Sequence, residues 1–190
     1  LPMEDRQVEW LFKNPLSDGG QFTGVSNLVM KYGVVPSEIM PENHQSNNTS
    51  QISNLLQLKL REYGLKLREQ RDRRAPVALK TEMLTELYSM LVRAYGVPPT
   101  EFEWTLRNKA GEVVSTKSYT PQSFYKEYFG DLDLEKDFVM VMNDPSREYY
   151  KVYEIEYDRH VYDGDNWVYL NLPIDEVKAL AIASIKDNTA

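Results

Sequence analysis

Residues 18–36 read DGGQFTGVSNLVMKYGVVP and contain a turn, a helix and the end of that helix. The pair Gly19-Gly20 is typical of a plain turn, and it would also allow a second backbone, such as an extended peptide, to approach closely. Residues 23–32 place apolar side chains on one helical face and predict a helix. Gly33 follows at the position where a glycine commonly ends a helix, and the chain continues as an extended segment.

Helical patterns surround this stretch. Residues 5–13 predict a short helix before Pro15, and the polar residues 41–50 predict a loop. A long amphipathic helix is expected over 50–71 and a second over 79–95, separated by a break at Ala75-Pro76. Two amphipathic helices joined by a short break predict a helical hairpin.

The character of the sequence changes at Glu101. Strand-like segments flank a turn at 108–111, and Thr120-Pro121 is a strong helix start, with a cap followed by proline. The remaining elements are expected to be strands over 102–107, 112–118, 137–142, 150–157 and 167–172, and helices over 120–129 and 174–186. This order of helices, strands and a final helix predicts an α+β fold.

The composition excludes several classes of function. The 190 residues contain no cysteine, which excludes a disulfide scaffold, a thiolate metal site and a cysteine nucleophile supplied by this chain. The net charge of −7 disfavours nucleic acid as a partner. Residues 57–80 hold eight basic and three acidic side chains, a pattern that suits an anionic partner but more commonly marks a solvated helix face. No stretch reaches the roughly 18–20 apolar residues of a membrane span, so no membrane partner is expected.

The two histidines are candidates for catalysis or metal binding. His160 lies near three aspartates in the sequence, but Asp-Gly-Asp-Asn over 163–166 is also typical of a turn, and one histidine makes a thin ligand set. His44 lies in a polar stretch, where a general base would need a partner from elsewhere. We expect no metal and no cofactor, and a serine- or metal-dependent hydrolase that uses His44 or His160 stays open as an alternative.

Several short motifs, in their order and spacing, resemble the family of bleomycin hydrolase and bacterial aminopeptidase C, which are papain-fold cysteine peptidases. The resemblance extends over essentially the whole chain. The motifs are DGGQF at 18–22, KYGVVP at 31–36, MPE at 40–42, LKLR at 58–61, LRE at 67–69, YGVPP at 95–99, TPQSFY at 120–125, VMNDP at 141–145 and YLNLP at 169–173.

The resemblance implies a partial papain-like fold with an inserted helical hairpin and a small antiparallel sheet. Residues 1–49 would belong to the papain-like helical subdomain and contain the substrate-cleft segment. Residues 50–98 would form the inserted hairpin, which in the family helps to build a hexameric barrel. Residues 99–190 would form an α+β segment with antiparallel strands and a C-terminal helix. The family also implies a cytoplasmic homo-oligomer.

The same resemblance assigns one wall of a substrate cleft to Asp18, Gly19, Gly20, Gln21 and Phe22. In papain-like enzymes the glycine pair binds the substrate backbone as an added strand, and the next two residues line the pocket for the second substrate side chain. The family's catalytic cysteine would precede the region that matches residue 1, and its histidine and asparagine would follow the region that matches residue 190. No catalytic residue is therefore assigned to this chain.

Two functions follow as expectations. The favoured one is a central fragment of a cysteine aminopeptidase. The fragment would be inactive alone and would bind peptide in the complete enzyme. Its partners would be the remaining parts of the same protein. The alternative is a stand-alone module for peptide binding or oligomerisation, so whether the chain is itself an enzyme stays open. In both cases exposed apolar surface predicts self-association.

Overall fold

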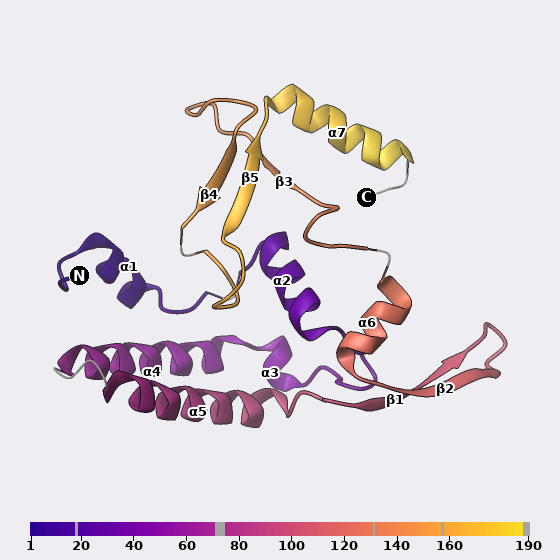
Figure 1. Cartoon of the computed structure of the whole chain (residues 1–190), viewed down its shortest axis with the longest axis horizontal. Helices are drawn as coiled ribbons and strands as arrows, with labels where there is room; N and C mark the ends of the chain where they lie inside the picture. The colour runs from indigo at the N-terminus through magenta and orange to yellow at the C-terminus, as the bar shows by residue number, and fades with distance from the viewer. Residues whose placement is uncertain (18, 71–74, 131, 157, 188–190) are drawn as a thin grey trace. The chain divides into compact units, whose positions relative to one another are not determined.

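The computed structural model of the chain is shown in Figure 1. It describes residues 1–17, 19–70, 75–130, 132–156 and 158–187. The chain forms two compact units, and the polypeptide passes through each of them twice. The first unit contains Leu1–Gly19 and Pro36–Thr100, and the second contains Gly20–Val35 and Glu101–Ala190. The boundary between the units therefore falls inside the predicted cleft segment, after Gly19.

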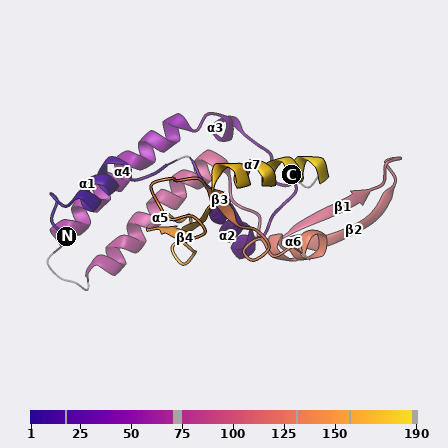
Figure 2. The same ribbon diagram turned by 90° about the horizontal axis from the view of Figure 1, so that it is seen from above.

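The first unit is helical. Its elements are α1 (Arg6–Lys13), α3 (His44–Asn47), α4 (Ser50–Glu69) and α5 (Ala75–Tyr95). Helices α4 and α5 lie side by side as a hairpin (Figures 1 and 2). Apolar side chains of the two helices meet in a buried core made by Leu56, Tyr63, Met83 and Leu87. The apolar stripes of the two helices thus cover each other, as amphipathic helices in a pair normally do.

Two details of this unit differ from the prediction. Helix α5 begins at Ala75 rather than at residue 79, because proline is tolerated in a first helical turn, where its missing N–H breaks no helical hydrogen bond. Residue 71, the predicted end of the preceding helix, lies outside the described residues. The expected loop at 41–50 contains α3, whose start is capped by the Asn43 side chain, which accepts hydrogen bonds from Gln45 N and Ser46 N at 2.9 and 3.0 Å.

Polar side chains fasten the shorter helices to the hairpin. Arg61 of α4 donates from Nε to Phe12 O at 2.8 Å and from Nη2 to Lys13 O at 2.9 Å, which satisfies carbonyls at the end of α1. Asn43 donates from Nδ2 to Ala94 O at 3.0 Å and so joins the start of α3 to the end of α5.

The second unit combines helices with two small sheets. Its elements are α2 (Phe22–Tyr32), β1 (Phe102–Arg107), β2 (Val113–Tyr119), α6 (Pro121–Phe129), β3 (Met140–Met142), β4 (Val152–Ile155), β5 (Trp167–Asn171) and α7 (Ile174–Asp187). Strands β1 and β2 form an antiparallel hairpin. The other sheet has the order β3-β5-β4, with β5 antiparallel to β4 and parallel to β3.

Helix α2 is anchored to α6 at its C-terminal end. Gly33 ends α2 with φ 77°, and a Cβ at this position would overlap the Pro121 carbonyl, so both the conformation and the space require glycine. Val34 N donates to Pro121 O at 3.2 Å, and Gln122 Nε2 donates to Lys31 O at 2.7 Å. These bonds hold the C-terminal end of α2 against the first residues of α6.

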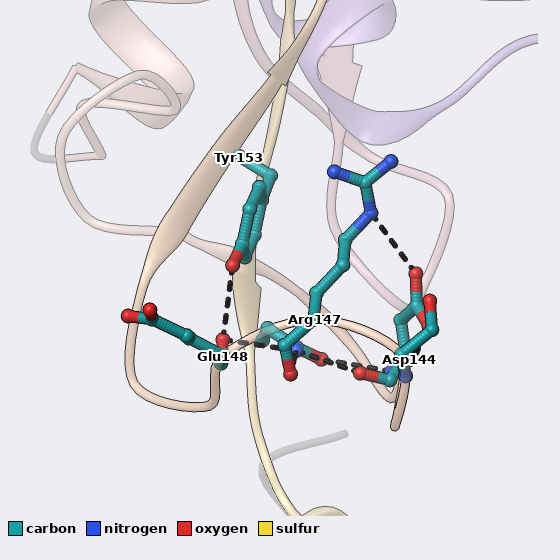
Figure 3. A network of polar contacts seen from close by, with 6 residues as sticks. Asp144, Arg147, Glu148 and Tyr153 are labelled. Carbon is teal, nitrogen blue, oxygen red and sulfur yellow. Dashed lines mark hydrogen bonds and ion pairs between the residues drawn. The ribbon is translucent and has the colours of Figure 1, made fainter.

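A polar network replaces strand pairing in the loop between β3 and β4 (Figure 3). The Arg147 Nε donates to Asp144 Oδ2 at 3.1 Å, and its guanidinium lies 5.1 Å from the centre of the Tyr153 ring. The Tyr153 hydroxyl donates to Glu148 O at 3.2 Å. Fully buried Asn171 donates to Asp144 O at 2.9 Å and accepts from Asp144 N at 2.8 Å.

Two strands are shorter than predicted, each for a local reason. Tyr150 has φ 61°, a left-handed conformation that is incompatible with a strand, so β4 begins at Val152. At the start of β3, Asp137 belongs to a turn, since its amide donates to Asp133 O at 2.8 Å. The last three residues of the predicted strand 137–142 and the central residues 152–155 of the predicted strand 150–157 are nevertheless paired in the sheet.

Candidate functional site: the start of helix α2

The predicted cleft segment lies at the N-terminal end of α2. Asp18 lies outside the described residues. Gly19, Gly20, Gln21 and Phe22 are exposed to solvent. Gln21 is the N-cap of α2, with the extended values φ −122° and ψ 167°, and its carbonyl accepts from Gly24 N at 3.0 Å. An exposed segment that turns from extended chain into helix leaves backbone accessible to a peptide.

Gly20 packs closely against a side chain of the chain itself, His160. Its φ lies outside the left-handed region, so conformation alone does not require glycine there. A Cβ at Gly20 would lie 2.7 Å from Nε2 of His160, closer than real Cβ atoms approach a neighbour. A Cβ at Gly24, one helical turn further, would overlap the same imidazole ring. The two glycines therefore form a notch that His160 fills.

A pocket of about 280 Å³ opens beside Phe22. The Phe22 ring packs against Phe138, with ring centres 5.2 Å apart. Val139 and Val168 continue this apolar wall, whereas the polar part of the lining includes Glu135, Glu154 and Asp165. The pocket thus combines an apolar surface next to the exposed start of α2 with several carboxylates in its lining.

Buried Asn27 organises the polar side of the pocket. It is only 4% exposed, and its Nδ2 donates to Glu135 Oε1 at 2.9 Å. Its Oδ1 accepts from Asp165 N at 2.9 Å. One side chain of α2 thereby fixes two loops that line the pocket, and buried polar groups satisfied in this way specify a single arrangement.

The aspartates of the predicted 163–166 turn make contacts other than with His160. Asp163 accepts from Lys31 Nζ at 2.5 Å; this hydrogen bond is the main cause that lowers the pKa of Asp163 and raises the pKa of Lys31. The His160 ring stacks on Trp167, with ring centres 5.6 Å apart and an interplanar angle of 22°. Across the described ranges, no group of three or more His, Asp or Glu side chains is arranged to hold a metal ion.

His44 lies in the first unit, as the exposed first residue of α3. Its carbonyl accepts from Asn48 Nδ2 at 3.1 Å. Within the part of the chain that the structure describes, none of the helices is both long and apolar enough to cross a bilayer.

Sequence reasoning missed the contacts of His160, Gly24 and Asn27. Gly24 carried the one available signal, because a glycine in the first turns of a helix destabilises it relative to alanine and needs a reason. The partner of that glycine is distant in the sequence, so the pattern of α2 alone could not identify it. Asn27 gave no such signal, since a polar residue in a helix usually faces solvent.

Comparison with known proteins places the whole chain in one family. The model of the Peptidase C1-like family matches residues 1–190. The chain is 35% identical over 187 residues to aminopeptidase C of Listeria monocytogenes, a match that covers 97% of this chain and 42% of that protein. It is 34% identical over 195 residues to bleomycin hydrolase of Mus musculus, with 100% of this chain and 43% of that protein covered.

A solved structure agrees with both sequence matches. The crystal structure of PepW from Lactobacillus rhamnosis matches with a TM-score of 0.90 and 35% identity, over 98% of this chain and 43% of that one. The resemblance to these peptidases and the predicted α+β, papain-like fold class are thereby confirmed, although the chain spans less than half the length of the relatives it matches. Since the family model covers every residue, the chain belongs to the Peptidase C1-like family.

Proposed function

We propose that this chain supplies one wall of the substrate cleft of a cysteine aminopeptidase and does not hydrolyse peptides by itself. The observation that carries the proposal is the lack of any cysteine in a chain that matches aminopeptidase C over 97% of its length. A thiol peptidase needs a thiolate nucleophile activated by a neighbouring base. The nucleophile and its histidine and asparagine partners would come from other parts of a longer protein.

The cleft wall would bind the backbone of a peptide. The exposed Gly19-Gly20-Gln21 segment would pair with the substrate like an added strand, in which main-chain hydrogen bonds give affinity and side-chain pockets give specificity. Each such hydrogen bond contributes about 0.5–1.5 kcal/mol net. Phe22, at the mouth of the pocket beside α2, would contact a substrate side chain.

Exposed apolar faces support the requirement for further protein. Val25 and Leu28 of α2 are 53% and 38% exposed, and Ile185 of α7 is 72% exposed. Apolar surface of this kind on packed helices commonly marks an interface. We propose that the remaining parts of the same protein cover these faces.

The test compares this chain with the product of the complete reading frame that contains it. Both are assayed with aminoacyl-fluorophore substrates, with and without iodoacetamide. The proposal expects turnover by the complete protein, its loss after alkylation, and no turnover by the 190-residue chain. Turnover by the chain alone that resists alkylation would contradict the proposal and favour a hydrolase that uses His44 or His160.

A second candidate function is a stand-alone module for peptide binding or oligomerisation. Its support is the exposed apolar surface of the helical hairpin, where Leu58 of α4 and Leu84 of α5 face solvent. A homo-oligomer, such as the hexamer of the family, and a cytoplasmic location belong to this proposal and to the first one. A reading frame that continues through a cysteine motif upstream and a histidine motif downstream would exclude the stand-alone module, and sedimentation analysis of the chain measures its self-association.

A further inference from the structure

The His160 imidazole contacts the chain at two glycines, one just before α2 and one in its first turn. Near Gly20, the ring atoms closest to the position of a Cβ are Nε2 and Cε1, at 2.7 and 3.0 Å. Near Gly24, the closest ring atoms are Nδ1 and Cε1, the latter at 2.5 Å. The ring therefore contacts the exposed cleft segment at Gly20 and the buried Gly24 in the first turn of the helix that follows.

A face of the ring contacts a second side chain. His160 stacks on Trp167, the first residue of β5, with a ring-centre distance of 5.6 Å and an angle of 22°. Trp167 is paired with Ile155 of the antiparallel neighbouring strand β4. The imidazole thus connects strand β5 to two glycines whose missing side chains make room for it.

We propose that His160 is a positioning residue that fixes the backbone of Gly20 for substrate binding. This inference rests on the proposed function, in which Gly20 pairs with the peptide. Without the ring, the notch at Gly20 and Gly24 would be empty and the segment before α2 would sample more conformations. Binding a peptide would then have to order that segment, and affinity falls when a binding segment is not preorganised. His160 contacts the wall and not the reacting atoms, so the loss is expected in KM and not in kcat.

The experiment uses the complete protein and compares a variant that lacks the ring with one that keeps a flat ring in the notch. His160→Ala empties the notch, whereas His160→Phe keeps a flat ring of similar size that can stack on Trp167. We expect His160→Ala to raise KM by about five- to tenfold with kcat within about twofold, and His160→Phe to restore most of the loss. Glu156→Ala, an exposed position before the same loop, is the matched control and should leave both constants unchanged.

A double-substitution cycle tests the contact itself. Gly24→Ala places a methyl group where the ring lies, so it should displace His160 and raise KM by the same factor as His160→Ala. Because both changes remove one contact, the double variant Gly24→Ala/His160→Ala should be no worse than either single variant. Additive effects, or equal loss of KM and kcat in His160→Ala, would overturn the proposal.

A readout without catalysis keeps this inference separate from the proposed function. Hydrogen exchange at residues 19–24 should be faster in His160→Ala than in the parent protein and should return toward the parent rate in His160→Phe. An inactive parent protein would refute the proposed peptidase while leaving this measurement interpretable. Unchanged exchange in His160→Ala would overturn the positioning role even if the parent protein is active.

Discussion

The helical hairpin α4–α5 and helix α2 both carry apolar stripes, yet they use them in opposite ways. In the hairpin, Leu56 and Leu87 lie in a buried core. In α2, the buried residues are Gly24, Ser26 and Asn27, whereas Val25 is more than half exposed. An amphipathic helix usually buries its apolar side. The hairpin follows this rule within the chain, and α2 follows it only if further protein covers Val25 and its neighbours.

The comparison also separates two kinds of stabilisation. The hairpin gains its stability from apolar area removed from water, with polar groups at the rim. There the Tyr63 hydroxyl donates to Glu86, whose pKa is lowered by that hydrogen bond and by Lys59 at 3.0 Å. Helix α2 is instead held in its own unit by the hydrogen bonds of Asn27, by the hydrogen bonds between its C-terminal end and α6, and by the ring of His160. Substitutions should therefore have different signatures in the two regions.

The largest effect is expected in the hairpin core. Leu56→Ala removes a buried side chain from the cluster with Tyr63 and Met83 and should lower the free energy of unfolding by about 2–4 kcal/mol. Denaturant titration followed by circular dichroism measures this change. Leu58→Ala, at a position on the same helix that is 61% exposed, is the control and should change stability by less than about 0.5 kcal/mol. Equal effects at the two positions would contradict the buried core.

The second largest effect is expected at Asn27. Asn27→Leu keeps the volume of the side chain but leaves the Asp165 amide and the Glu135 carboxylate without their buried partner. The cost should be about 1–3 kcal/mol in the free energy of unfolding. Asn54→Leu on the exposed face of α4 is the control for the same replacement and should be nearly neutral. A neutral Asn27→Leu would show that α2 is attached by apolar contacts after all.

A third variant tests what covers the exposed face of α2. Val25→Ser in the 190-residue chain should change stability by less than about 0.5 kcal/mol, because the side chain is already exposed. In the complete protein the same substitution should cost about 1–2 kcal/mol if further chain packs on this face. Thermal unfolding of both forms measures the difference, and an equal, small effect in both would remove the argument that α2 awaits a partner.

The two regions also differ in how far they could be predicted. The hairpin was predicted because its leucines recur with a 3.6-residue period and the helix that covers them follows within a few residues in the sequence. The residues of the predicted cleft wall were located by family motifs, and the structure finds Gly20, Gln21 and Phe22 exposed together at the start of α2. The contact of His160 with Gly20 was not predictable. When two segments distant in the sequence approach each other closely, the sequence shows a glycine at the contact but no periodic pattern that identifies the partner.

The smallest effect concerns the exposed ion pair that joins α2 to the 163–166 turn. The hydrogen bond with Lys31 lowers the pKa of Asp163, so the pair contributes stability above the unfolded pKa of about 3.9, and this contribution is lost as the pH falls through the lower, folded value. The same bond raises the pKa of Lys31, so at the alkaline end the contribution is lost as the pH rises through that raised value. Because both side chains are exposed, solvent screens the pair and the effect should be small.

Asp163→Asn and Lys31→Met should each remove the same part of the acid-induced loss of stability, measured as Tm between pH 3 and pH 7. If the acid dependence stays intact in both variants, the ion pair does not stabilise α2, and its attachment would rest on Asn27, the ring of His160 and the hydrogen bonds to α6.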